Sequence, residues 1–312
     1  MGGYSTIVGN FIPRNRPMNT YTLQGKSALV TGGSGGIGEV TARELARLGA
    51  DVTIIGRNTE RNQTAVYRIQ QALAASNGQT PGSISSITAD LSDLNQVQRA
   101  AQEYRLRNDR LDVLVNNAGG FFWKRQDTVD GYELTFALNH LNYFLLTREL
   151  LPLLESSADG QHSRVVNVSS DAHQSGRMDF DNLQFERGYN GWLAYSNSKL
   201  ANVLFTFELA RRLQGSPVTA NVLHPGFVRT NFAKNNGLLF RLAKPIADLA
   251  AIPVDEGAQT SIYLASSPDV EGVSGEYFVK SQPIRAAAQA YDGASARRLW
   301  EISEEMVERI AS

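Results

Sequence analysis

A tyrosine and a lysine four residues apart are the side chains of this sequence best suited to moving a proton. Tyr195 and Lys199 belong to the stretch Tyr-Ser-Asn-Ser-Lys. If this stretch is helical, the two side chains share one face, one turn apart. A lysine ammonium beside a phenol favours the phenolate, so it would lower the tyrosine pKa from about 10 towards neutral pH. Such a phenol could exchange a proton with a substrate oxygen, although the spacing also fits a tyrosine packed on a lysine stem.

A glycine-rich segment is the second feature with a chemical meaning. Glycines stand at positions 32, 33, 35, 36 and 38, after an apolar run at 27–31 and before a helical pattern at 39–48 that Gly49 would end. Residues 51–55 then read as a second strand. A strand, a glycine turn, a helix and a strand within about thirty residues predict a dinucleotide site. Two registers stay open, one with glycines at 33, 35 and 38 and one with glycines at 32, 36 and 38.

The alternation of strand and helix patterns continues along the chain. Further strands are predicted at 83–88, 111–115, 164–168, 219–223 and 277–279, and helices at 59–76, 94–104, 132–151, 195–213, 255–265 and 294–310. This order predicts an α/β fold, a doubly wound parallel sheet of seven strands with helices on both faces. Residues 1–25 read as an irregular arm and residues 26–312 as a single domain. Functional side chains should gather beyond the carboxyl ends of the strands.

Composition excludes several other classes of protein. The 312 residues include 30 basic and 31 acidic side chains, so the sequence shows no electrostatic footprint for nucleic acid. There is no cysteine, which excludes disulfides and thiol catalysis, and the four histidines have no metal-ligand spacing. No apolar run is long enough to span a membrane, and residues 1–24 lack the pattern of a secretory signal. We therefore expect a cytoplasmic protein without a metal site.

Five short motifs in this order resemble the motif set of the short-chain dehydrogenase/reductase family, classical type. They are Thr31-Gly32-x-x-x-Gly36-x-Gly38, Asn116-Asn117-Ala118-Gly119, Ser170, Tyr195-x-x-x-Lys199 and Pro225-Gly226. The resemblance covers Gly25 to Val279 and implies a single-domain Rossmann fold. Segments around Asn139, Ser170 and Lys199, and the segment 224–230, look more like the retinol-dehydrogenase-like branch.

The resemblance implies a catalytic group of four residues. Tyr195 would be the acid or base, and Lys199 would hold the nicotinamide ribose and lower the pKa of the tyrosine. Ser170 would polarise the substrate carbonyl, while the neighbouring Ser169 would be a structural hydroxyl. Asn139 would hold a water that relays protons to the lysine. The alternative for Asn139 is a buried amide whose hydrogen bonds are satisfied within the fold.

The resemblance also implies a nicotinamide cofactor and the residues around it. They are Gly32, Ser34, Gly36, Ile37, Gly38, Arg57, Asp90, Leu91, Asn116, Ala118, Gly119, Tyr195, Lys199, Pro225, Gly226, Val228 and Thr230. Asn116 would line the cofactor. Asp90 and Leu91 would touch the adenine, unless Asp90 instead caps the next helix, a role that Ser92 or Asp93 could also fill.

The choice between the two nicotinamide cofactors depends on the end of the second strand. An acidic residue there binds the ribose of NAD and repels a 2′-phosphate, but this sequence has Gly56, followed by Arg57. A guanidinium suits phosphate oxygens, and Arg61 is a candidate second contact. We therefore expect NADP(H) to be preferred, with NAD(H) still possible. The alternative is that Arg57 is a solvated turn residue.

Aromatic and aliphatic residues flank the predicted site. Phe121, Phe122 and Trp123 follow the Asn-Asn-Ala-Gly segment directly, and residues 231–254, where the family has its substrate lid, are rich in apolar side chains. This lining favours an apolar aldehyde, ketone or alcohol, retinal-like ones included, although core packing would also explain the lid residues. Residues 171–193 would form a flap near the site.

These expectations combine into one leading function. It is an NADP(H)-dependent alcohol dehydrogenase or carbonyl reductase. The family resemblance also implies that a homodimer or homotetramer is possible, joined through the helices beginning near Tyr132 and Tyr195, unless the flap hinders or reshapes that contact. The alternative is a catalytically silent NADP(H)-binding sensor or scaffold of the same fold. Retention of Tyr195, Lys199 and Ser170 favours the enzyme.

Overall fold

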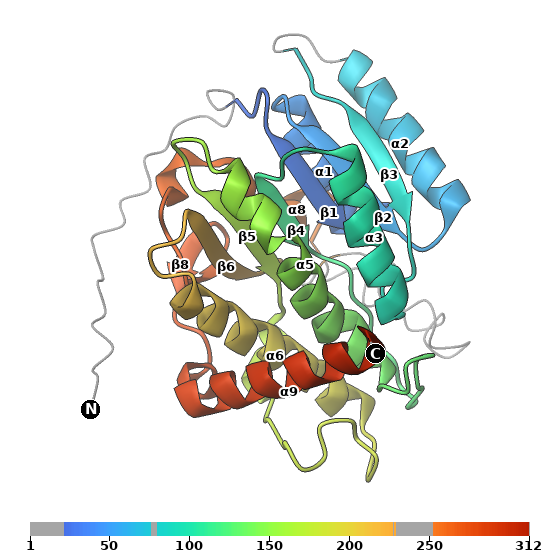
Figure 1. The fold of residues 1–312 in the computed structure, drawn as a ribbon, viewed down its shortest axis with the longest axis vertical. Coiled ribbons are helices and arrows are strands. Elements are labelled where there is room, and N and C mark those ends of the chain that lie inside the picture. Colours follow the sequence, from blue (N-terminus) through green and yellow to red (C-terminus); the bar gives the residue numbers. More distant parts are fainter. Residues whose placement is uncertain (1–21, 76–79, 227, 229–251, 312) are drawn as a thin grey trace.

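A single sheet runs through the computed structural model, which describes residues 22–75, 80–226, 228 and 252–311 (Figure 1). Nearly all of the predicted arm at 1–25, most of the predicted lid and Thr230 lie outside the described residues. The strands follow the order β3-β2-β1-β4-β5-β6-β7-β8. Their bounds are β1 Ser27–Thr31, β2 Asp51–Gly56, β3 Ile84–Thr88, β4 Val113–Asn116, β5 Ser163–Val168, β6 Val218–His224, β7 Tyr277–Val279 and β8 Gln282–Ile284.

The predicted parallel sheet is confirmed from β1 to β7, but the predicted number of seven strands is wrong. An eighth strand, β8, pairs antiparallel with β7 at the edge of the sheet. Its turn consists of Lys280 and Ser281, which both have a positive φ without being glycine. The strand is short and contains Pro283, a residue that is tolerated at a sheet edge. The sequence therefore has neither the alternation of apolar and polar residues nor the glycine or asparagine turn that predicts a hairpin.

Helices cover both faces of the sheet, as predicted. On one face lie α1 Gly36–Arg47, α2 Thr59–Ala74 and α8 Val254–Ser266; on the other lie α3 Leu94–Arg107, α5 Asn142–Ser157, α6 Gly191–Arg212 and α9 Gly293–Ala311. Consecutive strand residues alternate between the two layers, so Leu29 packs in one core cluster and Val30 in the other. Both are fully buried, which explains why the strands read as continuous apolar runs.

The helix predicted at 132–151 is interrupted near its start. Its first turn is α4, Leu134–Phe136, which Glu133 caps by accepting from the amides of Thr135 at 2.9 Å and Phe136 at 2.8 Å. A π-helical turn, Ala137–Leu141, then leads into α5. Such turns often occur at functional sites, and this one carries Asn139. Short 3₁₀ turns complete the structure: η3 Asp171–Ser175, η4 Pro268–Val270 and η5 Ala288–Tyr291.

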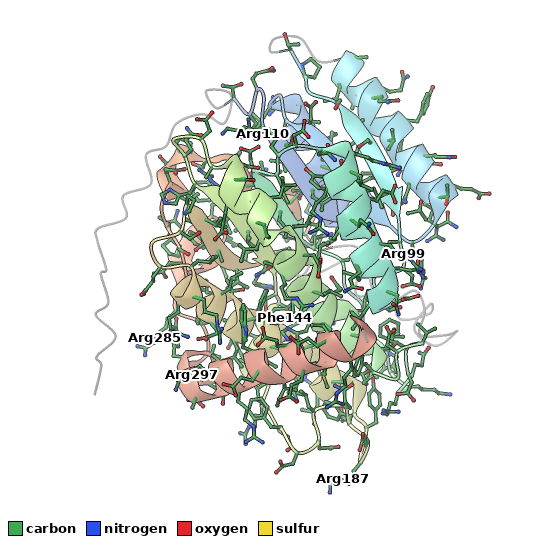
Figure 2. The ribbon with its side chains drawn as sticks, viewed as in Figure 1. Arg99, Arg110, Phe144, Arg187, Arg285 and Arg297 are labelled. Atoms are coloured by element: carbon green, nitrogen blue, oxygen red, sulfur yellow. The ribbon has the colours of Figure 1, made fainter. Side chains whose placement is uncertain are left out.

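The last helix, α9, lies across α5 and α6 (Figure 1). Trp300 of α9 stacks on Phe205 of α6 with ring centres 5.8 Å apart, and it meets Phe144 of α5, labelled in Figure 2, at 4.9 Å. Ser303 of α9 is 2.9 Å from the buried ring of His140. On the face through which a dimer was expected, α9 thus packs on part of α5 and α6, and the predicted dimer stays a prediction.

Among the residues that the structure describes, no helix is both long and apolar enough to cross a bilayer.

Candidate active site

Tyr195 and Lys199 lie together on α6, as their spacing predicted. The helix begins at Gly191 because the side chain of Asn190 accepts hydrogen bonds from the amides of Trp192 at 3.0 Å and Leu193 at 3.1 Å. This cap places Tyr195 in the second turn and Lys199 one turn later. Both side chains are buried, and the lysine nitrogen is 5.8 Å from the centre of the phenol ring.

Lys199 is held by the end of strand β5. Its ammonium donates to the carbonyl oxygen of Val168 at 3.1 Å, and Asn202 and Tyr143 approach the same oxygen at 3.4 and 3.5 Å. Burial lowers the pKa of Lys199 to about 7. The amine is therefore poised to change its charge near neutral pH.

The pKa of Tyr195 moves in the direction opposite to the one predicted. Burial raises it to about 12, while a hydrogen bond with Ser170 acts in the lowering direction. Burial is the larger effect on this phenol, and the expected lowering of its pKa by Lys199 stays a prediction. At neutral pH the phenol thus keeps its proton and can donate it.

The two serines after β5 have different surroundings. Ser170 caps the N-terminus of η3, where its hydroxyl oxygen accepts from the amide of Ala172 at 3.3 Å, and it also hydrogen-bonds with Tyr195. Ser169 is buried and donates to the carbonyl oxygen of Lys199 at 2.7 Å, so it is the structural hydroxyl that was expected. The catalytic role of Ser170 stays a prediction.

Asn139 is a buried amide with satisfied hydrogen bonds. Its Oδ1 accepts from the amide of Gly120 at 2.7 Å, and its Nδ2 donates to the Gly120 carbonyl at 3.0 Å and to Ser198 Oγ at 2.9 Å. Ser198 in turn donates to the carbonyl of Tyr195 at 2.7 Å. The alternative interpretation, a buried amide whose hydrogen bonds are satisfied within the fold, therefore describes Asn139. Its role in holding a water that relays protons stays a prediction. The sequence analysis did not single out Ser198, which links Asn139 to the backbone of Tyr195. Its position directly before Lys199 could have indicated it.

The glycine loop leaves the N-terminus of α1 uncovered by side chains. Gly35 precedes the helix without any side-chain cap, and a Cβ built on it would meet nothing within 4 Å. At Gly38 a Cβ would lie 2.5 Å from the carbonyl oxygen of Gly32. Gly32 and Gly36 both have positive φ, which favours the register with glycines at 32, 36 and 38. Free backbone amides at a helix N-terminus fit a pyrophosphate.

Asn117, not Asn116, is the asparagine that faces the glycine loop. The Asn116 amide is fully buried and donates to Thr147 Oγ1 at 3.0 Å and Asn167 Oδ1 at 2.9 Å, so its side chain is directed into the fold. Asn117 Nδ2 donates to the carbonyl of Thr31 at 2.8 Å. Adjacent residues at a strand end point to opposite faces, and a cofactor contact by Asn116 stays a prediction.

Several other predicted cofactor residues have side chains that pack against neighbouring elements of the fold. The side chains of Leu91 and Ala118 pack in the core, and Ile37 packs against α8. Gly119 lies beside Lys199, because a Cβ built on it would be 3.5 Å from the lysine nitrogen. Asp93, rather than Asp90, caps α3.

The remaining predicted cofactor residues border the two ends of the site. Arg57 is exposed and reaches Asp90 at 3.6 Å. Ser34 Oγ would be 2.9 Å from a Cβ built on Gly56. On the β6 side, Pro225 and Gly226 follow the strand, and Val228 forms a parallel bridge with Ile252.

Aromatic rings surround the phenol. Phe121 meets Tyr195 edge-on with centres 5.7 Å apart, and Trp123 meets Phe121 at 4.7 Å. Trp192 lies 6.3 Å from Tyr195, although sequence reasoning placed it only in the flap. Residues 171–193 are fastened to this wall, because Tyr189 donates to the carbonyl of Phe122 at 2.9 Å. The predicted flap thus borders the phenol.

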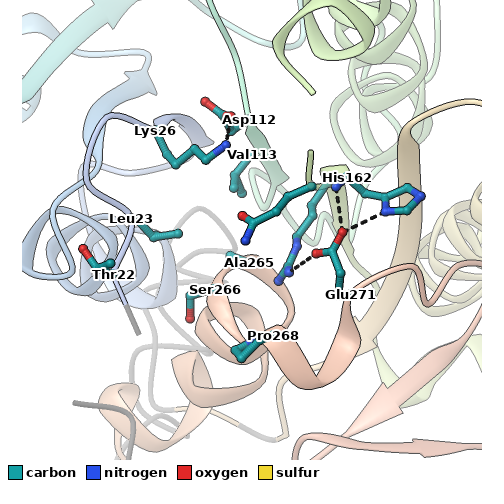
Figure 3. A pocket seen from close by; sticks show the side chains of 12 residues that line it. Thr22, Leu23, Lys26, Asp112, Val113, His162, Ala265, Ser266, Pro268 and Glu271 are labelled. Atoms are coloured by element: carbon teal, nitrogen blue, oxygen red, sulfur yellow. Dashed lines mark hydrogen bonds and ion pairs between the residues drawn. The ribbon is translucent and has the colours of Figure 1, made fainter. Parts of the chain in front are cut away.

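A separate pocket of about 230 Å³ opens at the opposite ends of the strands (Figure 3). It lies near the amino ends of β1, β4 and β5, away from Tyr195. Its charges pair with one another: Lys26 with Asp112 at 3.1 Å, and Arg164 with Glu271 at 2.8 Å. Within the described part of the chain, no group of three or more His, Asp or Glu residues could hold a metal.

Comparison with known proteins gives the same family as the motifs. Residues 26–238 match the family model described as short chain dehydrogenase. The chain is 47% identical over 294 residues to retinol dehydrogenase 14 of Mus musculus, covering 91% of this chain and 86% of that protein.

Two solved structures are similar over most of the chain. An uncharacterized protein from Mycobacterium paratuberculosis is 35% identical with a TM-score of 0.72, covering 92% of this chain and 95% of that one. The Pseudomonas aeruginosa RhlG/NADP active-site complex is 30% identical with a TM-score of 0.63, covering 82% and 95%.

Two glycines of the loop should respond differently to alanine. Gly38→Ala forces a Cβ to 2.5 Å from a backbone oxygen, so we expect a loss of about 2 kcal/mol or more in unfolding free energy. Gly35→Ala has open space and an extended φ of 177°, so the fold should keep its stability. Denaturant unfolding of both variants measures this. Equal stability of the two variants would contradict the described loop.

Proposed function

The chain belongs to the short-chain dehydrogenase family, and from this premise we propose that it is an NADP(H)-dependent alcohol dehydrogenase or carbonyl reductase. One observation carries the proposal. The phenol of Tyr195, the ammonium of Lys199 and the hydroxyl of Ser170 meet at the carboxyl end of β5, next to the uncapped N-terminus of α1. This is the edge of an α/β sheet where ligands bind.

The side chains support proton transfer to a substrate oxygen. When bound, the nicotinamide supplies or accepts the hydride. Tyr195 keeps its proton at neutral pH and donates it to the carbonyl oxygen during reduction, and Ser170 gives that oxygen a second hydrogen bond. Lys199, with a pKa lowered to about 7, can take up or release a proton one helical turn away.

The residues present fit a nicotinamide dinucleotide. The open Gly35–Gly38 amides would hold the pyrophosphate, and Gly119 and Lys199 would lie along the nicotinamide ribose. In this proposal residues 26–312 are one catalytic domain, and residues 171–193 form a wall of its substrate site.

The lack of space for a side chain at the end of β2 supports a preference for NADP(H). A Cβ at Gly56 would be 2.2 Å from the buried Oδ1 of Asn62, so the acidic residue that binds the ribose of NAD has no room there. Arg57 follows with an exposed guanidinium, suited to a 2′-phosphate.

The rings around the phenol support an apolar substrate. Phe121, Trp123 and Trp192 form an aromatic border on one side of Tyr195. A lining of this kind favours apolar aldehydes, ketones and alcohols, retinal-like ones included, which agrees with the name of the retinol dehydrogenase relative.

Removal of the phenol hydroxyl tests the mechanism. Tyr195→Phe should lower kcat by about 10²–10⁴-fold, because the positioned acid is lost. Binding of NADPH, followed by its fluorescence, should stay within about twofold of the wild type, since stacking surfaces are kept. The exposed Tyr67→Phe on α2 is the matched control and should keep full activity. Near-normal turnover by Tyr195→Phe would refute the role, and a wild type inert towards every aldehyde would favour the silent sensor.

A homologous series of aldehydes tests the substrate class. The ratio kcat/KM should rise by up to about fourfold for each added CH₂ until the pocket is full, because each buried CH₂ contributes about 0.8 kcal/mol. Trp192→Ala should weaken this rise for long aldehydes and leave short ones nearly unchanged. A flat series, or a preference for sugars or hydroxy acids, would contradict an apolar pocket.

Arg57→Ala tests the cofactor preference. The ratio kcat/KM with NADPH should fall roughly tenfold to a hundredfold, because a charge-assisted contact of about 1.5–3 kcal/mol is lost, while the ratio with NADH should barely change. Arg105→Ala, which removes an exposed arginine paired with Glu149, is the control for net charge. Equal falls in kcat/KM with NADPH and NADH would show that Arg57 does not bind the 2′-phosphate.

A further inference from the structure

A buried histidine shortly after Ser170 has both ring nitrogens engaged with backbone. His173 lies in η3 and is 1% exposed. Its Nδ1 is 2.7 Å from the carbonyl oxygen of Ser170, and its Nε2 is 3.1 Å from the backbone amide of Ala287. The proposed reaction does not use this ring.

The two partners fix the tautomer of His173. The amide of Ala287 can only donate, so Nε2 carries no proton and accepts. The carbonyl of Ser170 can only accept, so Nδ1 carries the proton and donates. A neutral ring is required to make both bonds, and burial lowers the pKa of His173, which keeps the ring neutral.

The turn that carries His173 is fastened to the segment before α9. The side-chain amide of Gln289 approaches the carbonyls of Gln174 at 3.0 Å and Gly176 at 3.1 Å. The ring of His173 packs on Tyr277 of β7 with centres 4.8 Å apart. These contacts join the residues after Ser170 to a part of the chain more than a hundred positions later.

The turn is also pressed against the helix of the catalytic pair. A Cβ built on Gly176 would be 2.7 Å from the carbonyl oxygen of Ser196 and 2.8 Å from Leu200 Cβ, so the turn and α6 are in close contact. On the other side, the amide of Asp171 donates to His224 Nδ1 at 3.0 Å. Ser170 therefore sits on a backbone segment held from α6, from β6 and from the C-terminal segment.

We propose that His173 is a positioning residue, which holds the main chain of Ser170 against the Ala286–Tyr291 segment and thereby keeps the serine hydroxyl in place beside Tyr195. This inference rests on the proposed role of Ser170 in the reaction. A displacement of about 1 Å at such a group can lower a rate by roughly a hundredfold. The ring itself does not touch the reacting atoms in this account.

Two amide substitutions separate the two hydrogen bonds. Asn at 173 places its amide near the position of Nδ1 and can still donate to Ser170, while Gln reaches the position of Nε2 and can still accept from Ala287. We expect both variants to lower kcat, His173→Gln by about 10–100-fold because the bond to Ser170 is lost, and His173→Asn by about tenfold because the tie to Ala287 is lost. The KM for NADPH should change less than about twofold in both, because the cofactor contacts lie elsewhere. Wild-type kcat in either folded variant would overturn the proposal, because it would show that one of the two bonds is not needed.

A double-mutant cycle with Ser170→Ala distinguishes the inference from the proposed function. In the Ser170→Ala background, His173→Gln should change kcat by less than about twofold, because the group it positions is gone. If His173→Gln lowers kcat as strongly there as in the wild type, His173 does not act through Ser170 and the inference fails alone. If Ser170→Ala itself leaves kcat unchanged, the assigned role of Ser170 fails and the inference with it.

A second variant keeps the test decisive where His173→Gln does not fold. Ala287→Pro removes the donor to Nε2 and leaves the ring intact, and the φ of −57° at Ala287 suits proline. The expected result is a fall in kcat of about tenfold that disappears in the Ser170→Ala background. Full activity of folded Ala287→Pro would show that the tie to the C-terminal segment does not position the serine.

Discussion

The burial of one lysine constrains the whole site. Lys199 is 3% exposed, and a buried ammonium is costly unless polar groups surround it. The end of β5 meets this requirement, since the carbonyl of Val168 accepts from the lysine while Asn202 and Tyr143 approach the same oxygen. The segment after β4 also lies close to it, because a Cβ built on Gly119 would be 3.5 Å from the lysine nitrogen. The surroundings of the lysine therefore come from the ends of two neighbouring strands, β4 and β5.

The sequence allowed most of the fold, and the proximity of Tyr195, Lys199 and Ser170, to be predicted. Strands buried on both faces read as apolar runs, and helices with one apolar face lie between them, so element order and topology follow from periodicity. Tyr195 and Lys199 share one face of α6 because they are four residues apart, and Ser170 lies near them because it follows the carboxyl end of β5. The glycine loop was predictable for the same reason, since Gly38 has no room for a Cβ.

Other features depend on contacts that local sequence does not encode. The direction of the Asn116 side chain is set by partners on β5 and α5, and the pKa values of Tyr195 and Lys199 are set by burial. The hairpin of β7 and β8 uses Lys280 and Ser281 at positive φ, where glycine or asparagine is usual. The hydrogen bond between His173 and Ala287 joins residues that are distant in the sequence, so no short motif predicts it.

The C-terminal helix has a consequence for self-association. Because α9 covers the apolar side chains of Phe144 and Phe205, this side of the molecule presents to its surroundings the outer surface of α9 instead. That surface carries charges of both signs, with exposed Arg297, Arg298, Glu301, Glu305, Glu308 and Arg309. The cores of interfaces between proteins are depleted of such charged side chains, so the outer surface of α9 suits an interface less well than the apolar side chains beneath it. The helix thus acts as an intramolecular cover that shields an apolar surface.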